Sequence, residues 1–519
     1  LRDVTYESVL KRLRRDYHHR AAEWLILVAG DRVDEYADQI AAHFTAAGDT
    51  PAEANWQTRA GLQAAHRYAA PEAVRAFSRA LELTPDDDHA GRYKLLAERL
   101  KMADLLGDRP AQLADIEALK RLATALGDQR RQAEALLEET RYHQITGAYE
   151  NASAVGERAL LLAEEAGDIA LQARAQSAQG SAQMFLGDYD AARAYLERSL
   201  PLARQSGNRR TEVEALRTLG ILLQEQGDFV GQFSYFEAAL ALAHELGDRV
   251  AERRALNSLG VAVQGVGRYE EAMGYYEGSL TIARAIGDRV GEGTVLGNMG
   301  ILANHLGDYA RSRALFEEAL QIAREADDQT GVNICLLNLG TVITYLGEFD
   351  AALPPLEEAR RGAEETADRP LMGYVLNGIG YSLVAGRRYE AAVPVLQQGC
   401  ELRLELGQPH LAIETRAFLA EALAATGQPA AAMTEAEVVL DFLVDGQLEE
   451  LEDTLRVLLA VYRTLAAAGD ARAAAVLARA HDDLQTAAAR LDDDARRAYL
   501  ENVPWNRAIV ALWSESSEQ

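Results

Sequence analysis

The chain has 519 residues, of which 48% are hydrophobic, so it can bury cores and is not a disordered polypeptide. It carries 53 Lys and Arg against 80 Asp and Glu, a formal net charge of −27 at pH 7. A surface this acidic repels phosphate backbones and anionic lipid, so we expect neither nucleic acid nor a membrane as the main partner.

The first 52 residues do not follow the pattern of the rest and predict a helical junction. Apolar residues at three- and four-residue spacing, including Leu10, Leu13 and Tyr17, predict the packed side of a helix. The opposite side is basic, with Lys11, Arg12, Arg14, Arg15, His18 and Arg20. This side is either solvated or docks on an acidic or nucleotide-binding neighbour. Because the chain begins at Leu1 within a helix-like stretch, we expect it to be a piece of a longer polypeptide.

From residue 53 to residue 486 the sequence repeats every 40 residues. The loop glycines that mark the period are Gly107, Gly147, Gly187, Gly227, Gly267, Gly307, Gly347 and Gly427, with a lapse at Arg387. Halfway between them lie dipeptides such as Gly127-Asp128. Glycine ends a helix in the left-handed conformation and Asp caps the next one. We therefore expect about ten or eleven helix pairs, followed by capping helices and a tail over residues 487–519.

A second set of glycines lies inside the predicted helices, at Gly180, Gly220, Gly260, Gly300, Gly340 and Gly380. Glycine in a helix interior costs about 1 kcal/mol relative to alanine. A cost that recurs every 40 residues indicates a recurrent gain, which we interpret as close approach of the partner helix. Large residues on the second helix, Tyr276, Phe316, Leu356 and Leu396, are the expected knobs.

This pattern of helix, G-D-Y/F turn and helix with small residues resembles the tetratricopeptide repeat, although these units are six residues longer than its usual 34. The resemblance implies an all-α fold, a right-handed α-solenoid of about 10–11 helix-turn-helix repeats with a helical N-terminal junction and a C-terminal capping helix. The long units resemble those of Pins/LGN-type polarity adaptors, kinesin light chains and the repeat arms of bacterial STAND-class signalling ATPases.

The two ends sharpen the last of these resemblances. The stretches YADQIAAHFTAAGD near the start and RRAYLENVPWNRAIVALW near the end resemble STAND proteins of the MalT-like and cyclase-associated kinds. The resemblance implies a sensor or autoregulatory arm whose basic N-terminal helix contacts an NTPase module outside this chain. The alternative is a free-standing adaptor or scaffold without an ATPase. The residues expected to cover the open end of the repeats are Val503, Trp505, Ile509, Leu512 and Trp513.

Residue patterns for catalysis are missing from the sequence. None of the four lysines follows a glycine, so there is no phosphate loop, and H-E-x-x-H, C-x-x-C and G-x-S-x-G do not occur. We therefore expect a chain that is not an enzyme and that needs no cofactor or metal. No signal peptide is visible. With Cys335 and Cys400 in apolar helical contexts, we expect buried thiols in a reducing cytoplasm.

What remains is a binding groove, which the resemblance places on the first helix of each pair. The groove positions of that repeat family select four arginines, Arg141, Arg174, Arg217 and Arg254. They also select polar and aromatic residues, namely Asn257, Asn298, Asn304, His305, Asn338, Tyr345, Tyr374, Asn377 and Tyr381. Arginine pairs with ligand carboxylates and asparagine bonds an extended backbone, so we expect a protein or peptide with acidic residues. Alternatively, the asparagines bond between repeats and the arginines pair with groove glutamates such as Glu214.

Overall fold

The computed structural model describes residues 10–444 except positions 227, 229, 327 and 367, and residues 454–517 except positions 490 and 492. These residues form helices and turns without a strand. The chain divides into two compact units, Leu1–Val295 (unit 1) and Leu296–Gln519 (unit 2), which we describe separately. The boundary falls within α16 (Arg289–His305).

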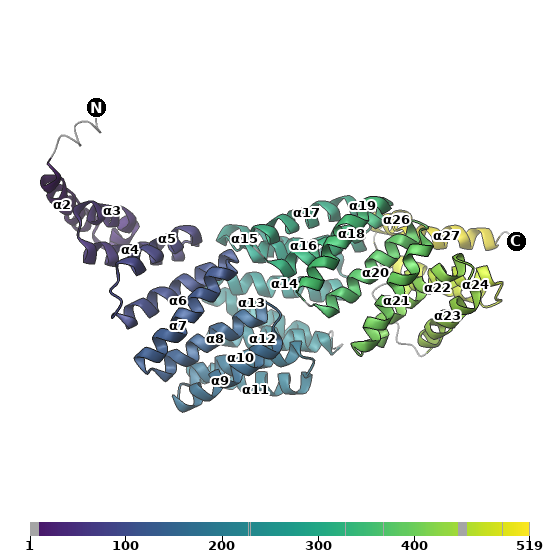
Figure 1. Ribbon diagram of the computed structural model, residues 1–519, viewed down its shortest axis with the longest axis horizontal. Helices are drawn as coiled ribbons and strands as arrows, with labels where there is room; N and C mark the ends of the chain where they lie inside the picture. The colour runs from purple at the N-terminus through teal and green to yellow at the C-terminus, as the bar shows by residue number, and fades with distance from the viewer. Residues whose placement is uncertain are drawn as a thin grey trace. The chain divides into compact units, whose positions relative to one another are not determined.

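Unit 1 is a succession of helices joined by short turns (Figure 1). They are α2 (Lys11–Ala29), the 3-10 helix η1 (Gly30–Tyr36), α3 (Ala37–Ala47), α4 (Thr50–His66), α5 (Ala70–Leu83), α6 (His89–Leu106), α7 (Arg109–Leu126), α8 (Gln129–Ile145), α9 (Tyr149–Glu165), α10 (Ile169–Phe185), α11 (Tyr189–Ser206), α12 (Arg209–Glu225), α13 (Gly231–Leu246), α14 (Arg249–Gly265) and α15 (Tyr269–Ile286). Consecutive helices pack against one another throughout this series.

Unit 2 continues the same pairing and ends in the four helices α24 to α27. Its helices after α16 are α17 (Tyr309–Glu325), α18 (Gln329–Tyr345), α19 (Phe349–Glu365), α20 (Arg369–Ala385), α21 (Tyr389–Glu405), α22 (Pro409–Ala425), α23 (Pro429–Val444), α24 (Thr454–Ala468), α25 (Ala473–Ala488), α26 (Asp493–Glu501) and α27 (Pro504–Ser517). Among the described residues, α4 to α25 thus make eleven helix pairs, which confirms the expected all-α repeat fold. The expected boundaries at residues 52/53 and 486/487 stay predictions.

The turns have the chemistry that the sequence predicts. Gly127 ends α7 with φ at 62°, and the side chain of Asp128 accepts a hydrogen bond from the Arg131 amide of the next helix. Such caps satisfy amides that the first turn of a helix leaves without partners. The same arrangement recurs through both units, although Gly227 lies outside the described residues. At Arg387 the left-handed conformation is kept without glycine, with φ at 57°.

The glycines inside the helices allow close packing within each pair. A Cβ atom built on Gly260 of α14 would lie 2.5 Å from a ring carbon of Tyr276 on α15. Gly300 and Gly340 meet Phe316 and Leu356 in the same way. Tyr276, Phe316 and Leu356 are fully buried, so the predicted knobs are confirmed.

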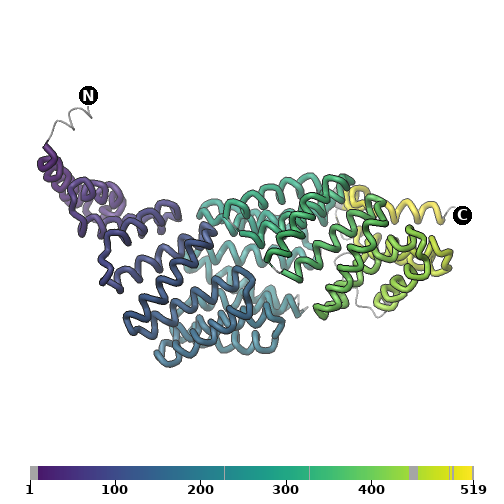
Figure 2. Tube along the Cα trace, in the orientation of Figure 1, coloured from purple at the N-terminus to yellow at the C-terminus, as the bar shows by residue number. Residues whose placement is uncertain are grey.

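The first helices of successive pairs also contact one another directly, α8 with α10, α10 with α12 and α12 with α14 in unit 1. In unit 2, α18 contacts α20, α20 contacts α22 and α22 contacts α24 (Figure 2). We call each of these series the first-helix row of its unit. The predicted groove positions lie on these rows, except Asn298, Asn304 and His305, which lie on α16. Of the helices searched, which are those of the described residues, none combines the length and apolar character needed to cross a bilayer.

The N-terminal helix α2 differs from the expectation. The stripe with Leu10, Leu13 and Tyr17 was expected to be packed, yet these three side chains are exposed. Ala21 and Leu25, the last two residues of the predicted stripe, are partly buried beside the buried Ala22, and Leu25 packs on the core around α3 and α4. The helix is apolar on two faces, so periodicity alone did not identify the packed one.

Candidate functional site

Five charged side chains meet on the first-helix row of unit 1, and we call them the arginine cluster. Nη1 of Arg254 on α14 lies 2.8 Å from Oε1 of Glu214 on α12. Nη2 of Arg217 lies 3.1 Å from the other oxygen of Glu214. Arg141 on α8 forms an ion pair with Asp104 at the end of α6. Four helices thus contribute to one group of charges.

The two parts of the arginine cluster influence each other electrostatically. Burial raises the pKa of Glu214, but the charges of Arg217, Arg254 and Arg141 outweigh burial, and the net pKa lies well below the usual range. Burial likewise raises the pKa of Asp104, while Arg141, Arg254 and Arg109 lower it to a net value below normal. Because Arg141 acts on Glu214 and Arg254 acts on Asp104, the cluster is one electrostatic unit.

The arginine cluster has three cations and two anions, so it carries one excess positive charge. Both partners of Glu214 are partly exposed, with Arg217 at 23% and Arg254 at 29% of the side chain. A guanidinium has five donors, and Glu214 uses only some of them. The arrangement can therefore accept a further carboxylate without first removing its own.

Arg253, the residue before Arg254 in the sequence, forms a buried ion pair. Nε of Arg253 on α14 lies 2.8 Å from Asp288, and both side chains are 8% exposed. Asp288 also accepts a 2.8 Å hydrogen bond from the amide of Gly291 at the start of α16. Because Asp288 is held by both Arg253 and the Gly291 amide, this buried pair restrains the rotation of α14 and thereby the position of Arg254.

The fourth predicted arginine, Arg174 on α10, pairs at 2.9 Å with Glu138 on α8. Each of the four arginines therefore has a carboxylate of this chain beside it. This agrees with the alternative interpretation, in which the groove arginines pair with carboxylates of the chain itself. For Arg217 and Arg254 that carboxylate is Glu214. Whether these arginines also meet a ligand stays a prediction.

The predicted asparagines and His305 lie on α14, α16 and α18. Asn257, Asn298, Asn304 and Asn338 are partly buried and His305 is exposed. Asn338 donates from Nδ2 to the carbonyl of Ile334 in its own helix at 3.0 Å. The side-chain oxygen of Asn304 is buried without a hydrogen bond among the described residues. Their proposed contact with a peptide backbone stays a prediction.

In unit 2 the predicted groove residues Tyr345 and Tyr381 contact the end of the same chain. Nη1 of Arg456 on α24 donates a 2.7 Å hydrogen bond to the hydroxyl of Tyr345 on α18. The Trp505 ring of α27 meets the Tyr345 ring edge to face, with centroids 5.0 Å apart. The Arg456 guanidinium lies 4.8 Å from the Tyr381 ring and 5.4 Å from the Trp505 ring. The chain itself thus fills this part of the row.

Asn377 on α20 has partners in the next repeat, and Tyr374 on α20 has one on the second helix of its own pair. Nδ2 of Asn377 donates to Glu414 at 2.9 Å, and its oxygen accepts a hydrogen bond from Thr415 at 3.1 Å. The guanidinium of Arg403 on α21 stacks 3.9 Å from the Tyr374 ring. Asn377 therefore bonds between repeats, as in the second interpretation of the asparagines.

Arg456 is the residue of this region that the sequence reasoning did not identify. It is 7% exposed and forms an ion pair with Glu414, which is 8% exposed. The available signal was a lone charge in the apolar run LRVLLAVY, which the packing of a helix buries only with a partner. Trp505, Val503 and Ile509 are buried as expected. They cover more than the end of the repeats, because Val503 also approaches the Gly307 turn before α17.

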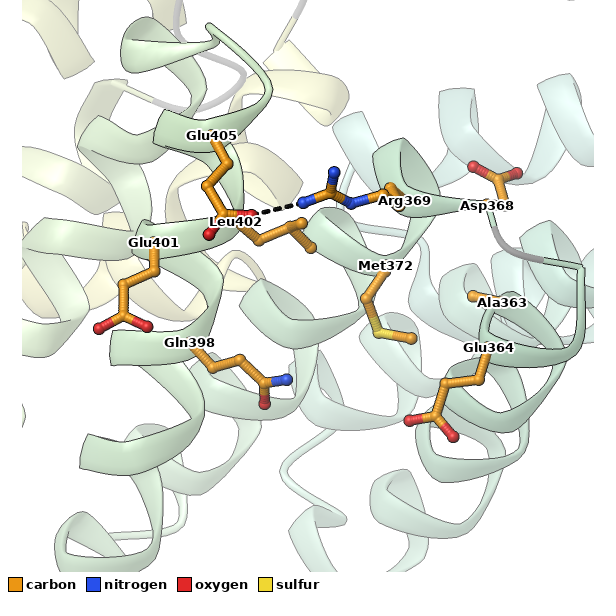
Figure 3. A pocket seen from close by; sticks show the side chains of 9 residues that line it. All are labelled: Ala363, Glu364, Asp368, Arg369, Met372, Gln398, Glu401, Leu402 and Glu405. Atoms are coloured by element: carbon orange, nitrogen blue, oxygen red, sulfur yellow. Dashed lines mark hydrogen bonds and ion pairs between the residues drawn. The ribbon is translucent and has the colours of Figure 1, made fainter.

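A surface cavity with a volume of about 410 Å³ lies elsewhere in unit 2, between α19, α20 and α21 (Figure 3). Glu401 and Glu405 of α21 face Arg369 and Met372 of α20 across it, and Arg369 pairs with Glu405. The remaining lining residues are Ala363, Glu364, Asp368, Gln398 and Leu402. The lining contains no Cys, His, Ser, Thr or Lys side chain. Its charged groups are four carboxylates and one guanidinium, so the cavity is acidic.

Neither the thiols nor any metal-ligating group adds a reactive centre. Burial raises the pKa of both Cys335 and Cys400 to about 12, which keeps these thiols protonated and unreactive at neutral pH. Among the described residues, no three His, Cys, Asp or Glu side chains lie close enough to hold a metal ion.

Comparison with known proteins identifies the repeats. The family model described as Tetratricopeptide repeat matches four overlapping stretches, residues 171–231, 213–285, 253–325 and 291–365. No curated protein matches the chain. These stretches contain the helices that supply Glu214, Arg217, Arg254 and Tyr345.

Solved structures with the same helix pairing include a signal transduction ATPase with numerous domains (STAND) from Pyrococcus horikoshii, which has a tetratricopeptide-repeat sensor. The two share 17% identity with a TM-score of 0.51, over 73% of this chain and 56% of that one. Others are the apo quorum sensor NprR from B. thuringiensis (15%, 0.48, 69% and 99%) and aspartyl phosphate phosphatase F from Bacillus subtilis (12%, 0.46, 70% and 95%). The aligned part thus spans little more than half of the STAND protein. The chain carries tetratricopeptide repeats from residue 171 to residue 365, within an all-α solenoid whose other helix pairs follow the same pattern.

Proposed function

We propose that this chain is a protein- or peptide-binding solenoid and that its ligand places a carboxylate at the arginine cluster of unit 1. The observation that supports this best is the convergence of Arg141, Arg217 and Arg254 from three helices on two carboxylates. Tetratricopeptide solenoids bind partners along the surface of their stacked repeats. A surplus cation on such a surface favours an acidic segment.

Charge on the rest of the chain makes this local surplus effective. At a net charge of −27 the protein repels an acidic ligand everywhere except where cations gather. The arginine cluster focuses the approach on one point of the first-helix row. Binding should therefore weaken as salt is raised, because screening reduces the attraction over a Debye length of about 8 Å at physiological ionic strength.

The experiment is recovery of a partner from the native cell with the whole chain, followed by affinity measurements on variants. We expect Arg217→Ala/Arg254→Ala to weaken binding by at least about thirtyfold, the effect of removing a desolvated hot spot. The matched control is Arg204→Ala/Arg324→Ala. These two arginines lie on the second helices α11 and α17, and each pairs with a carboxylate of the chain. Equal binding by the parent and the Arg217/Arg254 variant would contradict the proposal.

We further propose that the solenoid is the sensor or autoregulatory arm of a larger STAND-type ATPase in the cytoplasm, with α2 contacting its nucleotide-binding module. The resemblance at both ends of the sequence supports this assignment, together with the printed description of the Pyrococcus horikoshii protein. The alternative is a free-standing adaptor or scaffold without an ATPase. The reading frame upstream of the Leu1 codon distinguishes them. A phosphate loop within a few hundred codons supports the arm, and a start codon beside Leu1 supports the adaptor.

On either version we propose that this chain is not itself an enzyme, and we predict that it neither binds nor hydrolyses ATP. The sequence offers no phosphate loop, and its last lysine is Lys120. Calorimetry with ATP and Mg²⁺ should show no heat of binding at micromolar protein. A micromolar dissociation constant would contradict this prediction.

A further inference from the structure

Two turns of unit 1 that are far apart in the sequence meet in the structure (Figure 1). One is the α4–α5 turn, which contains Tyr68, and the other is the α15–α16 turn, which contains Gly287. A Cβ atom built on Gly287 would lie 3.7 Å from the carbonyl oxygen of Tyr68, which is van der Waals contact. Among the described residues, nothing lies within 4 Å of a Cβ built on the glycines of the corresponding turns, Gly127, Gly167, Gly207 and Gly247. The α15–α16 turn is therefore the one at which unit 1 meets its own beginning.

Tyr68 has a backbone conformation that glycine supplies at the α6–α7, α8–α9, α10–α11 and α14–α15 turns. Its φ is 56°, in the left-handed region that a residue with a Cβ atom rarely adopts. Among the described residues of unit 1, Tyr68 alone has this conformation without being glycine. Backbone strain of this kind persists where the surrounding structure holds it in place. At Tyr68 these surroundings include the Gly287 turn, which its carbonyl oxygen approaches.

A second link joins the same two parts of unit 1 through the arginine cluster. Asp104 lies in the last turn of α6, and Arg254 lies in the second turn of α14. Burial, the largest single influence on the pKa of both groups, disfavours their charged forms, yet each charge shifts the pKa of the other toward ionisation. Coulomb interactions in the presence of salt extend only over short distances, so α6 and α14 approach each other at this point.

The charges of the arginine cluster are arranged so that its two sides attract. Arg141 pairs with Asp104 on one side, and Arg254 pairs with Glu214 on the other. Each of these arginines also stabilises the charge of the carboxylate on the opposite side. Without the two arginines, Asp104 and Glu214 would repel each other. The arginine cluster is therefore an electrostatic link between the first and the last helices of unit 1.

We infer that the Tyr68–Gly287 contact and the arginine cluster together form a clasp that closes unit 1 into one superhelical turn. Stacked repeats contact only their neighbours and flex along their length, and a contact between distant repeats removes this freedom. Opening the clasp widens the turn and gives a partner access to the first-helix row. This consequence for access rests on the proposed function, whereas the clasp itself does not.

The test measures the width of the turn in the whole chain by double electron–electron resonance. Nitroxide labels are attached at Glu72→Cys on α5 and Ala285→Cys on α15, two exposed positions. The native thiols of Cys335 and Cys400 are buried, and the chain without added cysteines measures any label that they take up. We expect one narrow distance distribution for the labelled parent. A broad distribution, centred beyond the separation of the two positions in the structure, would overturn the inference.

The electrostatic part of the clasp is opened by Arg141→Gln/Arg254→Gln. This change removes the attraction across the arginine cluster, so the labels should shift to longer distances. The matched control is Arg209→Gln/Arg210→Gln, which removes the same charge at two exposed ion pairs of α12 and should leave the distances unchanged. Circular dichroism shows that each variant is folded. Distances equal to those of the parent in folded Arg141→Gln/Arg254→Gln would overturn the inference.

The contact part is opened by Gly287→Phe, which places a ring against Tyr68 and should also lengthen the distances. Its matched control is Gly247→Phe. The two glycines have similar φ values of 67° and 62°, so the substitution strains both backbones, but among the described residues only Gly287 has a neighbour within 4 Å. If both phenylalanine variants gave the distances of the parent, the two turns would not hold the clasp and the inference would be wrong.

Access is tested with the partner recovered in the experiment on the proposed function. Its association rate should rise in Gly287→Phe and keep the parent's value in Gly247→Phe, because neither change touches the arginine cluster. Equal rates together with longer distances in Gly287→Phe would show that the clasp does not control access. Failure to recover a partner would contradict the proposed function, and the distance measurements would still decide whether the clasp exists.

Discussion

Arg387 occupies the turn position that glycine holds in the neighbouring repeats. Its φ of 57° lies in the left-handed region, which costs a residue with a Cβ atom about 1–2 kcal/mol. We therefore predict that Arg387→Gly raises the free energy of unfolding by about 1 kcal/mol, less the added freedom of the unfolded chain. Urea denaturation of the two proteins measures this difference. The reverse change Gly347→Ala, at φ 82°, should lower stability, and a loss of stability in Arg387→Gly would contradict the argument.

The ionisation of Glu214 contributes to the stability of unit 1. Its pKa is lowered from 4.5 in the folded protein, because three arginine charges outweigh the effect of burial. The unfolded chain thus binds the proton more readily, so the stabilisation is complete above about pH 4.5 and is lost as the pH falls through the lowered pKa. We predict that Glu214→Gln is less stable than the parent at pH 7 and that the difference in urea midpoint shrinks toward pH 3.

The control for this pH dependence is Glu245→Gln, which changes an exposed glutamate that pairs with Arg209. Its difference from the parent should be small at both pH values, as for exposed ion pairs in general. A difference between Glu214→Gln and the parent that stays constant from pH 7 to pH 3 would show that the carboxylate contributes nothing through its charge.

Within a helix pair, two glycines fourteen residues apart should respond to the same substitution in opposite ways. A Cβ on Gly260 would meet the Tyr276 ring at 2.5 Å, whereas a Cβ on Gly274 of α15 would meet nothing within 4 Å. Gly260→Ala should therefore cost about 1–3 kcal/mol through overpacking. Gly274→Ala should stabilise by up to about 1 kcal/mol through helix propensity. If both variants have the same denaturant midpoint, the close approach of α14 and α15 is not sensitive to a methyl group.

The elements were predictable because their signals are local. A glycine in the left-handed conformation and an Asp cap fix where each helix ends, and both can be read from a dipeptide such as Gly127-Asp128. The contact between Gly260 and Tyr276 also lies within one repeat. A 40-residue period then placed the remaining pairs by repetition. The groove frame assigned its residues to the first helices for the same reason, and their contact with a ligand stays a prediction.

Glu214 was anticipated as a partner of the groove arginines, but the partners of Tyr345 and Tyr381 were not predictable, because they come from helices several repeats away. Tyr345 and Arg456 are 111 positions apart, and no period of 40 residues brings them together. The packed side of α2 could not be predicted from the sequence either, because Leu13 and Leu25 lie on different faces and both are apolar. In each instance the deciding term is tertiary packing, which local patterns do not contain.

In unit 2 as a whole, α24 and α27 supply side chains that complete the first-helix row. Trp505 is 9% exposed and touches Tyr345 and Arg456, so it joins helices that the repeat pattern keeps apart. We predict that Trp505→Ala lowers the stability of unit 2 by about 3–5 kcal/mol, as for other buried aromatic residues. Chemical denaturation followed by circular dichroism measures the loss. Trp24→Ala, at an exposed position, should change stability by less than about 0.5 kcal/mol.

The contact between Trp505 and Tyr345 also sets an order of events on the ribosome. The 160 residues between them take roughly 8–32 s to translate at 5–20 residues per second. During that interval the helices from α19 to α22 are synthesised and begin to leave the exit tunnel, while the Trp505 ring has not yet been made. Nascent unit 2 therefore presents Tyr345, Tyr381 and Phe418 uncovered, and a chaperone that recognises aromatic side chains has its opportunity to bind only before the last helix emerges.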